Sequence, residues 1–203
     1  MKRKILKMLT AFSFAAVLTT SFSAVGVANA KNEQSDEISC AAKSAYVLDF
    51  DTGTVVYAKN ENEKLPIASM TKIMTASIIL DDVKAGKLNL SDEITVSEKA
   101  AGMGGSQVFL DANSTHTIKN LLKAVVIASA NDAAVALSEA ASGSEEAFVK
   151  RMNDKAEKLG LSNTNFVNAT GLPALNAYSS AKDVSYMLKN LLSHDEYFEF
   201  SKI

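Results

Sequence analysis

One pair of residues has the types and the spacing needed for acyl transfer. Ser69 and Lys72 are three positions apart, which places both side chains on the same face of a helix. The residues that follow Lys72 are mostly apolar, and burial among such residues favours the uncharged form of an amine. A neutral Lys72 could accept the Ser69 hydroxyl proton while the serine oxygen attacks a carbonyl carbon. The pair therefore indicates a serine nucleophile with a lysine base.

The Ser-x-x-Lys pattern alone does not identify a site, because the chain contains it a second time. Ser179 and Lys182 have the same spacing. Here we interpret Ser179 and Ser180 as caps of a helix and Lys182 as a solvated residue of its first turn.

A second cluster, Ser129-Ala130-Asn131, lies between two apolar segments. One interpretation is structural, since Asn131 or Asp132 is a suitable N-cap for the helix that follows. The other is functional: the Ser129 hydroxyl relays a proton to a leaving group, and the Asn131 amide binds a substrate carbonyl. The sequence leaves both interpretations open.

The composition argues against the main alternatives to a serine–lysine pair. The chain has two histidines, His116 and His194, and one cysteine, Cys40. Neither histidine lies in a recognisable motif, so we expect both at the surface and no Ser-His-Asp triad. A single cysteine allows no internal disulfide, and with so few nitrogen and sulfur ligands we expect no zinc cluster.

The N-terminal 30 residues are typical of a secretion signal. A basic front precedes the apolar run of residues 8–27, and Ala28-Asn29-Ala30 supplies a cleavage site. The alternative is a retained membrane anchor. We therefore expect a signal peptide at 1–30 and a flexible segment at 31–42. Without the four basic residues of the signal the net charge falls from −2 to −6, which disfavours nucleic acid as a partner.

The pattern of the remaining chain predicts strands followed by a block of helices. Asp51-Thr52-Gly53 is typical of a turn, and it joins two β-prone segments, 45–50 and 54–57. Residues 91–114 are expected to form loops with brief strands. Apolar periodicity predicts helices over 69–83, 117–128, 132–141, 144–159 and 180–192. This order favours an α/β (α+β) fold in which an antiparallel sheet packs with a helical cluster.

Taken together, the two clusters resemble the S-x-x-K and S-x-N motifs of penicillin-binding proteins. The best match is with the low-molecular-weight D-alanyl-D-alanine carboxypeptidases, serine peptidase family S11, and it extends over residues 43–203. Other stretches similar to this family are the 45–53 hairpin, Pro66 to Thr75, Met152-Asn153, Leu159-Gly160-Leu161, Thr170-Gly171-Leu172-Pro173 and Tyr178 to Asp183.

The resemblance implies a serine β-lactamase/DD-peptidase-like fold and a specific reaction. Members of this family remove the terminal D-alanine from peptidoglycan stem peptides through an acyl-enzyme, and β-lactam antibiotics acylate the same serine. We expect no metal or organic cofactor. The expected location is extracytoplasmic, at the cell wall or the outer face of the cytoplasmic membrane, with membrane association only through segments that the 203 residues do not include. The implied roles are Ser69 as nucleophile, Lys72 as general base, Ser129 as proton relay and Asn131 as substrate binder.

The chain also departs from the family pattern. A third motif, Lys-Thr-Gly, does not occur in the 203 residues. We therefore expect a partial catalytic domain over 43–203, truncated at its C-terminus and lacking the strands that carry this motif. Losing one oxyanion donor costs about 10²- to 10³-fold in rate, so weak or no activity is expected. Asn113 stands where the family commonly has glycine, and Asn tolerates a positive φ.

Two other functions compete with this interpretation. A class A β-lactamase shares both motifs, but Leu172 stands where such an enzyme has the glutamate that activates water. An apolar leucine cannot act as a base. The third possibility is a non-catalytic fragment.

Overall fold

The computed structural model describes residues 40–201. The predicted signal peptide at 1–30, and the predicted flexible segment at 31–42 except for its last three residues, lie outside the described residues.

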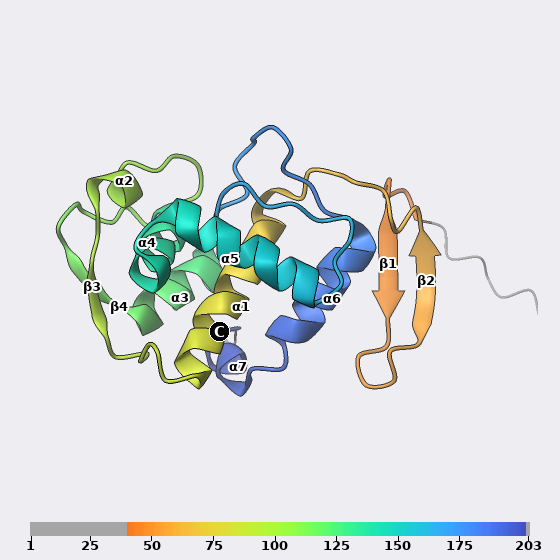
Figure 1. Cartoon of the computed structure of the whole chain (residues 1–203), viewed down its shortest axis with the longest axis horizontal. Helices are drawn as coiled ribbons and strands as arrows, with labels where there is room; N and C mark the ends of the chain where they lie inside the picture. Colours follow the sequence, from red (N-terminus) through yellow and green to blue (C-terminus); the bar gives the residue numbers. More distant parts are fainter. Residues whose placement is uncertain (1–39, 202–203) are drawn as a thin grey trace, which may run out of the picture. The chain divides into compact units, whose positions relative to one another are not determined.

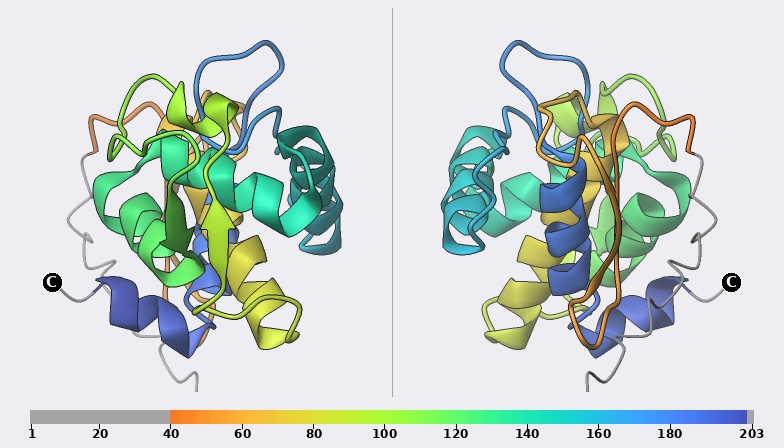
Figure 2. Two further views of the ribbon diagram at one scale, coloured as in Figure 1. Left: turned by 90° about the vertical axis from the view of Figure 1, so that its left-hand side faces the viewer. Right: turned by 90° about the vertical axis from the view of Figure 1, so that its right-hand side faces the viewer.

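The predicted hairpin is confirmed. Strand β1 (Ala45–Leu48) pairs antiparallel with strand β2 (Val55–Lys59), and the register shifts between Val47 and Leu48. Asp49 organises the turn, because its Oδ1 accepts hydrogen bonds from the Thr52 amide at 2.7 Å and the Thr52 hydroxyl at 2.6 Å. Helix α6 (Ala181–Leu191) packs along β1, as the right-hand view of Figure 2 shows.

The helix predicted to begin at Ser69 starts in two steps. Ala68–Met70 form a single 3₁₀ turn, η1, and helix α1 (Thr71–Lys84) follows it. Ser69 therefore precedes the α-helix by two residues. Most of α1 is buried, as expected for a helix that is apolar on nearly every side.

The brief strands expected within 91–114 are present in part. Strand β3 (Glu93–Thr95) pairs antiparallel with β4 (Thr115–Thr117), just past that segment. Between them lies the short helix α2 (Glu98–Ala101), whose N-cap is Ser97. Asn113 has a φ of 66°, so it adopts the left-handed conformation expected for a residue in place of glycine.

The remaining helices were all predicted except the last. They are α3 (Ile118–Ala128), α4 (Asn131–Ser142), α5 (Glu145–Lys158), α6 and α7 (Asp195–Ser201). Ser144 caps α5 by accepting a hydrogen bond from the Ala147 amide at 3.1 Å, and Ser180 caps α6 in the same way through the Asp183 amide at 3.2 Å.

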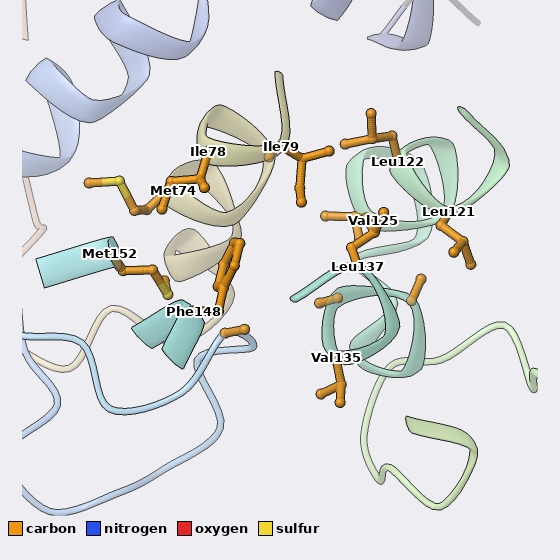
Figure 3. Close-up of a cluster of buried hydrophobic side chains, with 14 of the residues drawn as sticks. Met74, Ile78, Ile79, Leu121, Leu122, Val125, Val135, Leu137, Phe148 and Met152 are labelled. Atoms are coloured by element: carbon orange, nitrogen blue, oxygen red, sulfur yellow. The ribbon is translucent and has the colours of Figure 1, made fainter. Parts of the chain in front are cut away.

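Helix α1 lies at the centre of the helical cluster, with four other helices packed around it (Figure 1). It contacts α3, α4, α5 and α6. Figure 3 shows side chains from four of these helices meeting in a common core. The labelled members are Met74, Ile78, Ile79, Leu121, Leu122, Val125, Val135, Leu137, Phe148 and Met152, all of them buried.

The observed arrangement is a helical cluster with two small antiparallel sheets, in agreement with the predicted α+β class. Within residues 40–201, no helix is both long and apolar enough to cross a lipid bilayer.

Candidate active site

Ser69 and Lys72 face each other, as their spacing predicts. Lys72 Nζ lies 3.3 Å from Ser69 Oγ. Ser69 is exposed on the 3₁₀ turn, whereas Lys72 is only 4% exposed at the start of α1. The hydroxyl is therefore open to a ligand while the amine beside it is shielded from water.

The environment of Lys72 makes its amine a usable base. Burial lowers its pKa from 10.5 to about 8, because the charged form loses hydration. The amine also donates a hydrogen bond to the Thr170 carbonyl oxygen at 2.7 Å. That contact stabilises the ammonium, so the lowered pKa shows that burial outweighs it. At pH 7, one unit below that pKa, about a tenth of Lys72 side chains are uncharged.

Ser129 lies at the same cleft. It ends α3 with φ 54° and ψ 35°, a left-handed conformation that is uncommon for a residue with a Cβ atom. Ser69, Lys72 and Ser129 all line one cleft of about 150 Å³. Its other walls come from α1, α3, α6 and α7: Ile73, Ala76, Val125, Val126, Leu191 and Tyr197.

Asn131 is close in sequence but does not line this cleft. Its side chain is buried, and Nδ2 donates a hydrogen bond to the Gly104 carbonyl oxygen at 2.7 Å. Its backbone amide donates to the Ser106 carbonyl oxygen at 2.7 Å. The amide of Asn131 therefore holds the 104–106 loop beside the start of α4. Of the four predicted site residues, the structure brings Ser69, Lys72 and Ser129 together at one cleft. The fourth, Asn131, contacts the 104–106 loop instead.

The capping interpretation of this cluster is wrong. The N-cap of α4 is Ala130, which has no side-chain acceptor. Asp132 instead lies within the first turn of α4, fully buried, and its Oδ2 accepts hydrogen bonds from the Val108 and Leu110 amides, both at 3.1 Å. These two amides flank Phe109, which has a φ of 58° and is 79% exposed. In the sequence, only the position of an acidic residue at the start of an apolar helix indicated this interaction between Asp132 and the loop.

A second loop, residues 168–172, was also missed as part of the site. It contacts Lys72 through the Thr170 carbonyl and Thr75 through the Ala169 carbonyl, at 2.8 Å from Thr75 Oγ1. Nothing in local spacing links residues 72 and 170, so sequence patterns could not have placed this loop at the site. Leu172 is half-buried here and carries no group that could activate water.

The prediction that both histidines lie at the surface is wrong for His194. Its side chain is 3% exposed, and Nε2 lies 3.1 Å from Asp81 Oδ1. Neither ring nitrogen makes a hydrogen bond of acceptable geometry, and burial lowers the pKa of His194 below 6.5. His116 is half-buried and its Nε2 lies 2.9 Å from Ser114 Oγ. Neither histidine lines the cleft that contains Ser69.

In residues 40–201, no three side chains among His, Cys, Asp and Glu are grouped closely enough to hold a metal ion. The groups that meet at the cleft include two serine hydroxyls and an amine of lowered pKa. This set supports nucleophilic attack and proton transfer.

Comparison with known proteins points in one direction. The family model described as D-alanyl-D-alanine carboxypeptidase (Peptidase_S11) matches residues 29–203. The D-alanyl-D-alanine carboxypeptidase DacF of Bacillus subtilis (strain 168) is 45% identical over 196 residues, which are 97% of this chain and 50% of that protein.

Solved structures agree with this match. The crystal structure of the D-alanyl-D-alanine carboxypeptidase DacD from Francisella tularensis has a TM-score of 0.79 and 34% identity, over 80% of this chain and 40% of that one. Penicillin-binding protein D2 from Listeria monocytogenes, in an ampicillin-bound form, has a TM-score of 0.69 and 32% identity, over 79% of this chain and 65% of that one. The chain thus spans about half the length of the curated relative.

Proposed function

Because the chain belongs to the D-alanyl-D-alanine carboxypeptidase family, peptidase S11, we propose that it carries the nucleophile site of a serine-type carboxypeptidase. The substrate is a peptidoglycan stem peptide that ends in D-Ala-D-Ala. The observation that supports this proposal most directly is the 3.3 Å contact between Ser69 Oγ and Lys72 Nζ beside an open cleft.

Lys72 begins the reaction by accepting the Ser69 hydroxyl proton. The serine oxygen attacks the carbonyl carbon of the penultimate D-alanine, and the bond to the terminal D-alanine breaks. Ser129, which lines the same cleft, passes the proton to the leaving amine. Water then hydrolyses the ester on Ser69 and regenerates the enzyme.

Asn131 binds substrate from a more recessed position. One Nδ2 hydrogen is used by the Gly104 carbonyl oxygen, which leaves the second hydrogen and Oδ1 for the peptide backbone of the substrate. The contact with Gly104 fixes the orientation of the amide before substrate arrives. A fixed donor is more effective than a mobile one, because no reorganisation is needed during the reaction.

β-Lactam antibiotics are the second class of ligand. Their strained amide acylates Ser69 in the same way as the peptide. Leu172 provides no base to activate a deacylating water molecule, so the penicilloyl ester persists. This favours an inhibited carboxypeptidase over a β-lactamase.

The proposed organisation of the chain follows from this function. Residues 1–30 are a cleaved signal peptide, and residues 43–203 are part of a penicillin-binding catalytic domain. The site then operates outside the cytoplasm, where peptidoglycan is found.

The test is release of D-alanine from a synthetic pentapeptide that ends in D-Ala-D-Ala. We expect slow release by the wild-type chain, because its 203 residues contain no Lys-Thr-Gly motif, and none by Ser69→Ala. Ser162→Ala, at an exposed serine remote from the cleft, is the matched control and should behave like the wild type. Equal release by Ser69→Ala, or release by none of the chains, would reject the proposed function.

A further inference from the structure

The residue before the nucleophile is held in a conformation that its side chain disfavours. Ala68 has a φ of 46°, in the left-handed region where a Cβ atom crowds the following carbonyl. Such a conformation persists only where neighbouring structure imposes it. Since Ala68 directly precedes Ser69, whatever holds Ala68 also sets the direction of the Ser69 hydroxyl.

Gly171 lies directly against this peptide. A Cβ atom placed on Gly171 would lie 1.9 Å from the Ala68 carbonyl oxygen, 2.4 Å from its carbon and 3.0 Å from the Ser69 nitrogen. All three are backbone atoms, so no side chain can rotate to make room. Gly171 itself has a φ of 83°, which glycine adopts without strain. The glycine therefore allows a backbone-to-backbone contact that no other residue permits.

One side chain holds Gly171 in that place. Asn168 Oδ1 accepts hydrogen bonds from the Gly171 amide at 2.7 Å and from the Thr170 amide and hydroxyl, both at 3.2 Å. Asn168 Nδ2 donates to the Leu172 carbonyl oxygen at 2.9 Å. Both polar ends of Asn168 are thus used on the three residues that follow Ala169.

The same turn shields the base. The Thr170 carbonyl that accepts from Lys72 Nζ belongs to the peptide whose N–H group, on Gly171, binds Asn168 Oδ1. A further bond fixes the preceding residue, because the Ala169 amide donates to Glu145 Oε1 at 3.0 Å. One peptide unit therefore lies between the Asn168 side chain and the Lys72 amine.

Building on the proposed function, we propose that Asn168 and Gly171 are positioning residues for acylation. Asn168 fixes the Thr170–Gly171 peptide through hydrogen bonds. This peptide contacts Ala68 and thereby sets the direction of the Ser69 hydroxyl. The same peptide covers the Lys72 amine and keeps water from it. Neither residue touches the reacting atoms. Loosening the turn misdirects the hydroxyl and hydrates the amine together.

Two variants and one matched control test this proposal. Asn168→Ala removes the four bonds, and Gly171→Ala forces the turn away from Ala68. The control is Asn165→Ala, in the same loop, where the side chain donates only to the Asn176 carbonyl oxygen at 2.7 Å. The first readout is the pKa of Lys72, which is measured by an NMR titration of ¹³C-labelled lysine. The Lys72 resonance is assigned by its absence in Lys72→Arg. The second is the rate of acylation by benzylpenicillin.

We expect both variants to raise the Lys72 pKa from about 8 toward 10.5, because hydration restores the charged form. Acylation should slow about 10²-fold, as for a reactant displaced by roughly 1 Å. Asn165→Ala should leave both values unchanged. A wild-type Lys72 pKa in a folded Asn168→Ala chain would overturn the proposal. So would unfolding of both variants while the control stays folded, because the role would then be structural only.

The NMR titration separates this proposal from the proposed function. If the wild-type chain is not acylated but Lys72 titrates near 8 and shifts in the variants, the proposed function fails and the positioning role stands. If the wild type is acylated and the variants match it, only the positioning role fails.

Discussion

Lys72 is the residue whose charge decides whether Ser69 can be activated. Because burial lowers its pKa to about 8, the neutral amine increases as pH rises toward and beyond that value. The ammonium form has no lone pair and cannot accept a proton.

The rate of acylation by benzylpenicillin should therefore follow the neutral fraction of Lys72. We expect the rate to fall about tenfold for each pH unit below 8 and to level off above it. Lys72→Arg should lose about 10²- to 10⁴-fold, since a guanidinium stays charged. Stopped-flow measurements between pH 6 and 10 (about two units either side of the pKa) provide the profile. A rate independent of pH would show that Lys72 is not the base.

Ser129 allows its hydroxyl to be separated from its backbone conformation. Its φ of 54° is one that glycine adopts without strain. Ser129→Gly should therefore slow acylation, by about 10²-fold for a lost proton relay, without lowering the free energy of unfolding. Ser129→Ala should lose the same rate with little change in stability, because alanine keeps the Cβ atom that serine already has at this φ. Acylation kinetics and urea unfolding of both variants measure the rate and the stability separately. An unchanged acylation rate in either variant excludes Ser129 as the proton relay.

Among the individual residues of the site, the sequence predicted those contacts that join residues a few positions apart in the chain. The Ser69–Lys72 contact follows from helical spacing, and the low Lys72 pKa follows from an apolar helix. The contacts of Lys72 with Thr170 and of Ala68 with Gly171 join segments about 100 positions apart in the chain. Only the folded structure brings these segments together, so no local pattern could reveal them.

Among the elements, helix α4 does most to order the loops near the site. Its first turn carries Asn131, which holds the 104–106 loop, and Asp132, which binds the amides on both sides of Phe109. A buried carboxylate without hydrogen-bond partners is costly, so Asp132 favours the loop conformation that supplies these two amides. One carboxylate thus determines the path of the loop that follows α2.

Replacing Asp132 should therefore destabilise the chain more than replacing an exposed acid. We expect Asp132→Ala to lower the free energy of unfolding by about 2–3 kcal/mol, because it removes a fully buried carboxylate that accepts from two backbone amides. Asp154→Ala, at a partly exposed residue paired only with Lys150, should change it by less than about 0.5 kcal/mol. Urea unfolding measures both values. Equal losses would mean that Asp132 does not anchor the loop.

Most elements could be predicted because their signals are local. The hairpin turn and the helix caps Ser144 and Ser180 depend on residues within four positions of each other. Helix α7 has seven residues and no comparable periodicity. It is stabilised by packing against α3, which a single-segment pattern does not contain. The 3₁₀ turn at Ser69 was missed for the same reason, because Gly171, about 100 positions away in the chain, lies against its first residue.

For the molecule as a whole, His194 links the end of α6 to the centre of the helical cluster. It lies beside Asp81 of α1, whose Oδ2 pairs with Lys155 of α5 at 2.5 Å. Burial lowers the His194 pKa; the carboxylates Asp81 and Glu196 oppose this effect, and Lys155 and Lys84 add to it. The folded chain therefore binds this proton less readily than the unfolded chain.

The lowered pKa of His194 makes the folded chain more stable at higher pH. The contribution of His194 to stability is full above about pH 6.5 and is lost as the pH falls toward the lowered pKa. We expect less urea to be needed for unfolding at pH 5.5 (about one unit below the ordinary pKa) than at neutral pH. His194→Gln should reduce this difference, and His116→Gln should retain it. A pH dependence that is the same in all three chains would exclude His194 as its source.

The central claim is that Ser69, activated by Lys72, is the residue that forms the acyl-enzyme. The most direct measurement is incubation of the full chain with a fluorescent penicillin, followed by proteolysis and mass spectrometry of the labelled peptide. We predict one label per chain, on Ser69, and none on Ser69→Ala. A label on another residue, equal labelling of Ser69→Ala, or no label after prolonged incubation at high penicillin concentration would contradict the claim.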